Sequence, residues 1–100
     1  MRIRLSKHAR EAAMTRMAWT EEQAIKYYAK NSKYEFKHGT GAYNVVAGGV
    51  LFGLAVDYER NEIRVMTICV ARSFNESGYL GPLVDANGNR IHYSTRVTGV

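Results

Sequence analysis

The residues best suited to chemistry lie in a basic stretch near the start of the chain. His8 is preceded by Lys7 and followed by Arg10 and Arg16. Histidine exchanges a proton near neutral pH, and grouped cations attract a phosphate. Arg16 follows His8 by eight residues, a little over two helical turns, so both lie on roughly the same side of a helix. We predict His8 and Arg16 as catalytic residues of one cleft, with Lys7 and Arg10 holding phosphate. The competing interpretation is a surface histidine on a solvated helix.

Two later residues could add polar groups to the same cleft. Tyr43 would bring a hydroxyl and Arg64 a cation for phosphate or RNA, and Thr67 is an alternative to Arg64. Arg64 and Thr67 have opposite parity in a regular strand, so without a bulge they face opposite sides of a sheet. The sequence therefore predicts that at most one of them belongs to the site.

The chain lacks the signatures of the common catalytic families. It has no GxSxG motif, no P-loop, no dinucleotide-binding glycine motif and no HExxH. Metal ligands usually show a recognisable spacing, which its histidines and aspartates do not have. Those residues are His8, His38, His92, Asp57 and Asp85. We expect neither a metal nor another cofactor.

Charge is concentrated in the first forty residues. The net charge is +5, and residues 1–40 alone hold nine Lys or Arg against four Glu. Such a segment attracts RNA or another acidic partner, including an acidic protein surface. The one cysteine, Cys69, excludes an internal disulfide and lies in an apolar run that predicts a buried thiol.

Two helices are predicted before residue 32. Ser6 is a good N-cap for a helix over residues 7–17, in which Ala9, Ala13 and Met17 form an apolar stripe. Thr20 with Gln23 completes a capping-box pattern for a second helix that stops near residue 31. The residues of this second helix expected to face the core are Ala24, Ile25, Tyr28 and Ala29.

The pattern then changes to strands. Alternation or apolar runs predict strands at residues 33–37, 42–47, 50–56 and 62–70, and Gly48-Gly49 suits a tight hairpin turn. Residues 3–5 could form a short edge strand, and Asn87-Gly88 predicts a hairpin over residues 83–93. The fold class is therefore α+β, with two N-terminal helices packed on a four-stranded antiparallel sheet plus a C-terminal hairpin.

The third predicted strand has two unlike faces. Its large side chains alternate with smaller ones, which predicts helices on the large-residue face and a shallow cleft on the other. The large face carries Val50, Phe52, Leu54 and Val56, and the small face carries Leu51, Gly53, Ala55 and Asp57. One hundred residues give one domain, in which residues 1–71 form the main unit and residues 72–100 an extension.

Several short motifs resemble a family of small bacterial domains. The family opens with S-x-H-A, here Ser6-Lys7-His8-Ala9, carries arginines along the helix, and starts its second helix with a motif like residues 19–25. It ends with a strand like residues 62–68. Its order of elements is similar to that of RelE/BrnT-like toxins and of the barnase, colicin and RelE group of ribonucleases. Ala12 and Ala13 stand where the family has arginine and methionine.

The resemblance implies a metal-independent ribonuclease toxin. In such enzymes the RNA 2′-hydroxyl attacks the adjacent phosphate, with His8 as acid or base and Arg16 stabilising charge. An antitoxin would then be a partner. The alternative is a non-catalytic inhibitor, encoded by a phage or plasmid, that engages a host protein or nucleic-acid complex. A DNA-binding accessory protein comes last, because no helix-turn-helix pattern is present.

The cellular location is predicted from the N-terminus, which has no secretion signal, and from the apolar runs, which are too short to span a membrane. Residues 1–7 have no apolar segment of the kind that directs secretion. The longest apolar stretch, residues 45–56, is shorter than the ~20 residues that span a bilayer. We expect a cytoplasmic protein without a membrane segment.

Overall fold

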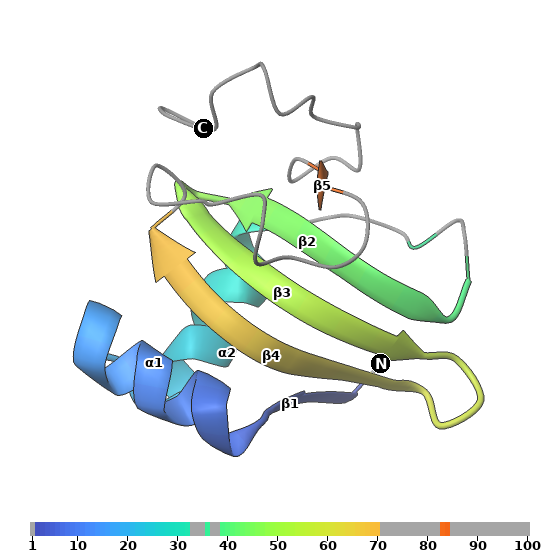
Figure 1. The fold of residues 1–100 in the computed structure, drawn as a ribbon, viewed down its shortest axis with the longest axis horizontal. Helices are drawn as coiled ribbons and strands as arrows, with labels where there is room; N and C mark the ends of the chain where they lie inside the picture. The colour runs from blue at the N-terminus through green and yellow to red at the C-terminus, as the bar shows by residue number, and fades with distance from the viewer. Residues whose placement is uncertain (1, 33–35, 37–38, 71–82, 85–100) are drawn as a thin grey trace.

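The computed structural model is an α+β domain in which two helices separate the first strand from the rest of the sheet (Figure 1). It describes residues 2–32, 36, 39–70 and 83–84. The elements in chain order are β1 (Arg2–Leu5), α1 (Lys7–Met17), α2 (Glu21–Asn31), β2 (Gly41–Ala47), β3 (Val50–Asp57), β4 (Glu62–Val70) and β5 (Leu83–Val84). No helix in the described part of the chain is long and apolar enough to cross a membrane.

The sheet is mixed, and this corrects the antiparallel prediction. Its strand order is β1-β4-β3-β2-β5. The hairpins β2–β3 and β3–β4 are antiparallel, as tight turns require, but β1 is parallel to β4 and β5 is parallel to β2. A parallel pair needs a long connection, which the two helices and the hairpin between β1 and β4 supply. Local alternation in residues 2–5 carries no information about that distant partner.

One predicted strand and the predicted C-terminal hairpin lie mostly outside the described residues. Of residues 33–37, only Phe36 is described, and it is buried without belonging to a strand. Of the predicted hairpin over residues 83–93, only Leu83 and Val84 are described; they form β5.

Local capping chemistry places both helices where the sequence predicts them. The Ser6 hydroxyl accepts a hydrogen bond from the Ala9 amide at 3.1 Å, which caps α1. Thr20 and Gln23 form the predicted capping box at the start of α2. Ala18 ends α1 in the left-handed conformation, at φ 55°, a region that favours glycine.

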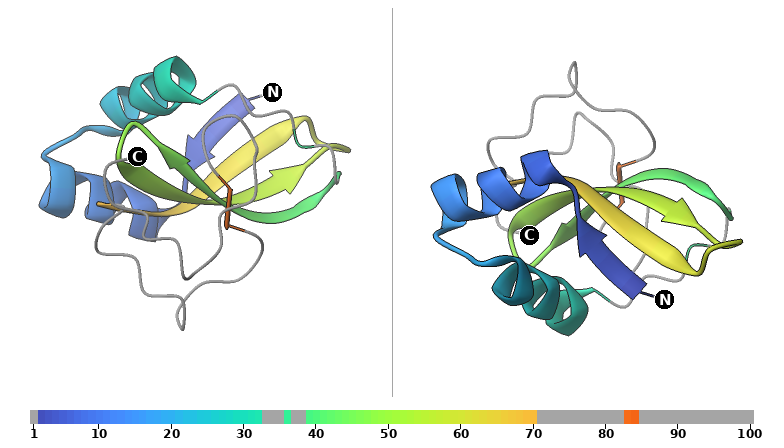
Figure 2. Two further views of the ribbon diagram at one scale, coloured as in Figure 1. Left: turned by 90° about the horizontal axis from the view of Figure 1, so that it is seen from above. Right: turned by 90° about the horizontal axis from the view of Figure 1, so that it is seen from below.

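The core lies between one face of the sheet and the helices, with Ala9 and Ala13 from α1 and Ala24 and Tyr28 from α2. Figure 2 shows α2 over that face of the sheet. The rings of Tyr28 and Phe52 meet edge to face, with centroids 5.1 Å apart. The predicted large face of β3 is buried there throughout. Ala29 is exposed, contrary to prediction, because the buried stripe of α2 is narrower than expected and Ile25 is only half-buried.

The opposite face of the sheet has a buried part and a more accessible part. Leu51 and Gly53 are buried there, whereas Ala55 and Asp57 are half-buried. The shallow cleft expected over the whole small-residue face of β3 is therefore restricted to the end that carries Ala55 and Asp57.

Candidate nucleic-acid interface

A β-bulge in β4 determines which side chains share the face away from α2. Val65 pairs with Leu54 and Thr67 with Gly53, so Met66 is an extra residue without a partner in β3. The insertion shifts the alternation by one position. Arg64 and Thr67 consequently face the same side, which corrects the prediction that only one of them could.

Three arginines form a basic strip on this face. Arg2 pairs with Glu62 and Arg4 pairs with Arg64 across the parallel β1–β4 ladder, so their side chains emerge on one side. We call Arg2, Arg4 and Arg64 the arginine strip. Sequence analysis missed Arg2 and Arg4. Their alternate positions in residues 2–5 were a signal that they share a face, but nothing local indicated that this face continues Arg64.

Glu62 supplies a carboxylate beside the arginines of the strip. It accepts a 2.7 Å hydrogen bond from Arg2, and Arg4 lies 4.0 Å away. The Arg2 hydrogen bond lowers the pKa of Glu62, partial burial opposes this, and the positive charges of Arg4, Arg2 and Arg64 lower it further. Within the described part of the chain, Arg64 makes no ion pair or hydrogen bond. Its guanidinium is thus available to an external anion.

A pocket of about 350 Å³ adjoins Arg64 at the end of β2, β3 and β4. It contains two guanidinium groups and two carboxylates, together with small or backbone-exposing residues. The lining residues are Thr40, Gly41, Ala55, Val56, Asp57, Arg60, Glu62 and Arg64. The pocket occupies the half-buried part of this face of the sheet, where Ala55 and Asp57 lie.

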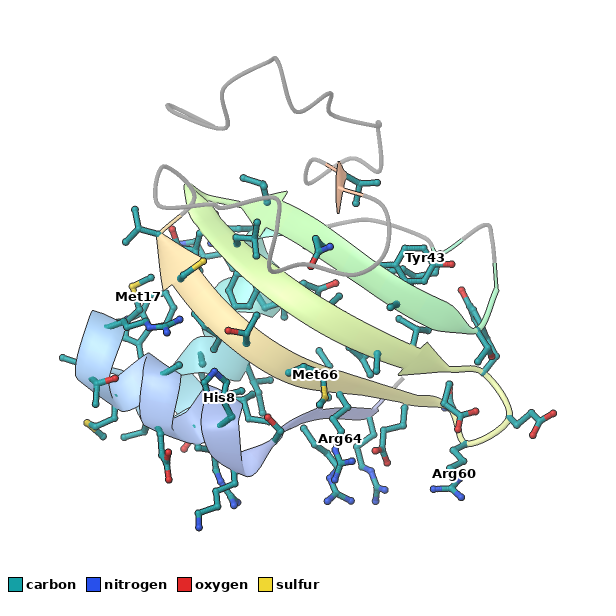
Figure 3. The ribbon with its side chains drawn as sticks, viewed as in Figure 1. His8, Met17, Tyr43, Arg60, Arg64 and Met66 are labelled. Carbon is teal, nitrogen blue, oxygen red and sulfur yellow. The ribbon has the colours of Figure 1, made fainter. Side chains whose placement is uncertain are left out.

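His8 is an exposed side chain in the first turn of α1, close to the end of β1. Met17, which packs against the core, lies about 180° around the helix from His8. His8 therefore lies on the flank of α1 away from α2, the side on which the arginine strip emerges. Figure 3 shows His8 beside β4, along which Met66 and Arg64 follow one another.

Arg16 makes a structural contact at the edge of the sheet. Its Nη1 donates a 2.8 Å hydrogen bond to the Ile68 carbonyl. At the other end of α1, the Ser6 amide donates to the Val65 carbonyl at 2.9 Å, and the Ser6 hydroxyl lies 3.4 Å from the Met66 carbonyl. Helix α1 thus continues where β1 stops and satisfies carbonyls along the edge of β4.

The other predicted site residues are not gathered around His8. Lys7 and Arg10 are exposed, about 100° and about 160° around α1 from His8. Tyr43 is buried against Phe36 on the helix-covered face, and its hydroxyl donates to the Gly39 carbonyl at 2.7 Å. Tyr43 and Arg64 therefore lie on opposite faces of the sheet.

Groups suited to holding a metal are absent from the described residues. No three His, Cys, Asp or Glu side chains come together there. His38, His92 and Asp85, which the sequence offered as ligands, lie outside the described residues. Cys69 is buried and forms no disulfide.

Comparison of the chain with protein-family models, curated proteins and solved structures found no match. Fold and site define the chain as an α+β domain with a mixed sheet that carries an arginine-rich face.

Proposed function

We propose that the protein binds single-stranded RNA across the arginine strip. The observation that carries the proposal is the strip itself: it places three guanidinium groups on adjacent strands, and Glu62 pairs with only two of them, Arg2 and Arg4. Residues two apart on a strand are ~6.6 Å apart and neighbouring strands ~4.8 Å apart, so the groups can contact successive parts of one phosphate backbone. Arginine also stacks on unpaired bases, a common mode of single-strand recognition.

We expect the affinity for RNA to fall as the salt concentration rises. Each phosphate contact with single-stranded nucleic acid contributes about 0.7 to the slope of log K against log salt concentration. Removing two guanidinium groups with Arg4→Ala and Arg64→Ala should lower that slope by about 1.4 and weaken binding. The control is Arg10→Ala, which removes one exposed arginine from α1, outside the arginine strip.

Fluorescence anisotropy with a labelled single-stranded RNA would measure both quantities. Unchanged affinity and slope in the double variant, with its fold intact, would refute binding through the strip. Binding of an acidic protein in place of RNA would favour the inhibitor alternative.

A second candidate function is RNA cleavage, which the position of His8 favours. From the flank of α1 next to the strip, the neutral imidazole could take a proton from an RNA 2′-hydroxyl. The O2′–P bond would form, the P–O5′ bond would break, and the leaving oxygen would take a proton from water. The products would be a 2′,3′-cyclic phosphate and a 5′-hydroxyl. Arg64 is suited to stabilising charge on that phosphate.

Cleavage is tested separately from binding. Purified wild type in EDTA should cut RNA, and His8→Ala should bind RNA with unchanged salt slope but leave it intact. Arg10→Ala again serves as the control. Intact RNA after incubation with folded wild type would exclude the nuclease and leave the binding proposal standing.

A further inference from the structure

The pocket beside the arginine strip has two guanidinium groups and two carboxylates in its lining, and one of the guanidinium groups is not in an ion pair. Asp57 already holds Arg60, with Oδ2 and Nε 3.7 Å apart, and its other oxygen accepts the Arg60 amide. Glu62 is held by Arg2 and approached by Arg4. Both carboxylates of the pocket therefore have other cationic partners, whereas Arg64, whose charge also acts on Glu62, makes no ion pair or hydrogen bond among the described residues.

The rest of the lining suits a flat ring. Ala55 contributes only a methyl group on this face, and Gly41 exposes backbone. Arg60 adds a second guanidinium, a planar group that stacks on nucleobases. In Figure 3 the side chains of Arg60 and Arg64 extend toward the same edge of the sheet. A volume of about 350 Å³ lies within the range of small-molecule sites.

We propose that this pocket binds one nucleotide, with its phosphate on Arg64 and its base over Ala55 against Arg60. The inference deepens the proposed function and rests on it where the nucleotide belongs to an RNA chain. A free mononucleotide offers the same phosphate and base. The pocket and the arginine strip share Arg64, so a bound strand could place one nucleotide in the pocket while its backbone crosses β1 and β4.

The decisive variant is Ala55→Leu, which fills the pocket without changing any charge. Its matched control is Ala42→Leu, because Ala42 pairs with Ala55 on the same face of the sheet but does not line the pocket. Nucleoside 5′-monophosphates would be titrated into labelled wild type and both variants, with amide NMR shifts recorded. We expect shifts at Thr40, Ala55 and Arg64, and an affinity about tenfold or more weaker for Ala55→Leu only.

Two comparisons with the nucleotide assign the parts of the ligand. The unphosphorylated nucleoside should bind about tenfold or more weakly, because it lacks the group that Arg64 holds. Inorganic phosphate should also bind more weakly, because it lacks the base. Equal binding of nucleoside and nucleotide would overturn the role of Arg64, and equal binding of inorganic phosphate would overturn the base site.

RNA binding by Ala55→Leu separates this inference from the proposed function. If wild type binds RNA but no mononucleotide, and Ala55→Leu binds RNA as wild type does, the pocket inference fails and the strip proposal stands. If mononucleotides bind but RNA does not, the pocket is a site for free nucleotides and the strip proposal fails. If neither ligand binds to folded protein, both are wrong.

Discussion

Gly53 lies where the β-bulge brings Thr67 against β3, and this contact predicts a specific energetic coupling. A Cβ atom built on Gly53 would be 2.8 Å from Cγ2 of Thr67, closer than real Cβ contacts occur. Threonine is β-branched, so its methyl cannot move away without a change of rotamer. Overpacking of this kind costs about 1–3 kcal/mol, while replacing a strand glycine by alanine returns about 0.5–1 kcal/mol. Gly53→Ala should therefore destabilise the fold by about 1 kcal/mol, and by no more than about 2.5 kcal/mol.

The control removes the methyl and keeps the hydroxyl. In Thr67→Ser, the nearest neighbours of a Cβ at Gly53 would be Oδ1 of Asn44 at 3.5 Å and Cβ of residue 67 at 3.9 Å, both ordinary contacts. Gly53→Ala on that background should be neutral or stabilising by up to about 1 kcal/mol. The four proteins form a double-mutant cycle with a coupling energy of about 1–3 kcal/mol.

Urea unfolding of all four proteins would measure this cycle, with thermal unfolding as a second observable. A loss of 1 kcal/mol corresponds to a fall in Tm of about 4–8 °C in a domain of this size. If Gly53→Ala costs the same on both backgrounds, the Thr67 methyl is not the obstacle and the reasoning from the bulge is refuted.

Three further predictions concern the helix ends and the arginine strip. Arg16→Met should lower the free energy of unfolding by about 1–2 kcal/mol, because the Ile68 carbonyl loses a charged hydrogen-bond donor at a partly exposed site. The control Arg10→Met should change the unfolding midpoint little. Equal losses of stability in the two variants would contradict a stabilising contact between Arg16 and β4. Ala18→Gly should stabilise the fold by about 0.5–1 kcal/mol, because alanine is strained at φ 55°. Ala29→Gly, at an exposed position inside α2, should instead destabilise the fold by about 1 kcal/mol. Urea unfolding midpoints that move in the same direction for both variants would contradict this reasoning. The pKa of Glu62 lies below its ordinary value of 4.5 in the folded state, so its contribution to stability is present above that pH and is lost as the pH falls through the folded-state value. Glu62→Gln should therefore flatten the acid limb of a stability–pH curve, and an unchanged limb would count against the pairing.

The sequence predicts those parts of the fold that local chemistry determines. Side chains near Ser6 and Thr20 specify both helix starts, and the paired glycines at residues 48–49 have the positive φ that a tight hairpin turn needs. The pairing of β1 with β4 depends on residues far apart in the chain, so its parallel direction had no local signal. The bulge at Met66 also has no local signal in the sequence, because every residue around it suits a regular strand.

In the candidate site, too, the sequence predicts some residues and misses those that depend on distant pairing. The chemistry of histidine and arginine led us to predict His8 and Arg64 as site residues, and the structure places both toward the arginine-strip face. Helical spacing put Arg16 about 80° from His8, but it could not show that the guanidinium reaches a strand carbonyl. Arg2 joins the site only through a ladder that the sequence alone does not reveal.

Pairing Arg2 with Glu62 joins residues sixty positions apart, and this has a consequence for folding kinetics. Closing so long a segment carries a loop entropy that local hairpins avoid, so we expect β2, β3 and β4 to associate before β1 docks. The two arginines of β1 then reach Arg64 only in the last step of folding. During synthesis, a nascent chain that ends before β4 carries the N-terminal positive charge without the surface that the strip forms. The rate at which RNA affinity recovers after dilution from denaturant would therefore measure how fast the last contacts, those between β1 and β4, form. Mutations at the β1–β4 ladder should mainly speed unfolding.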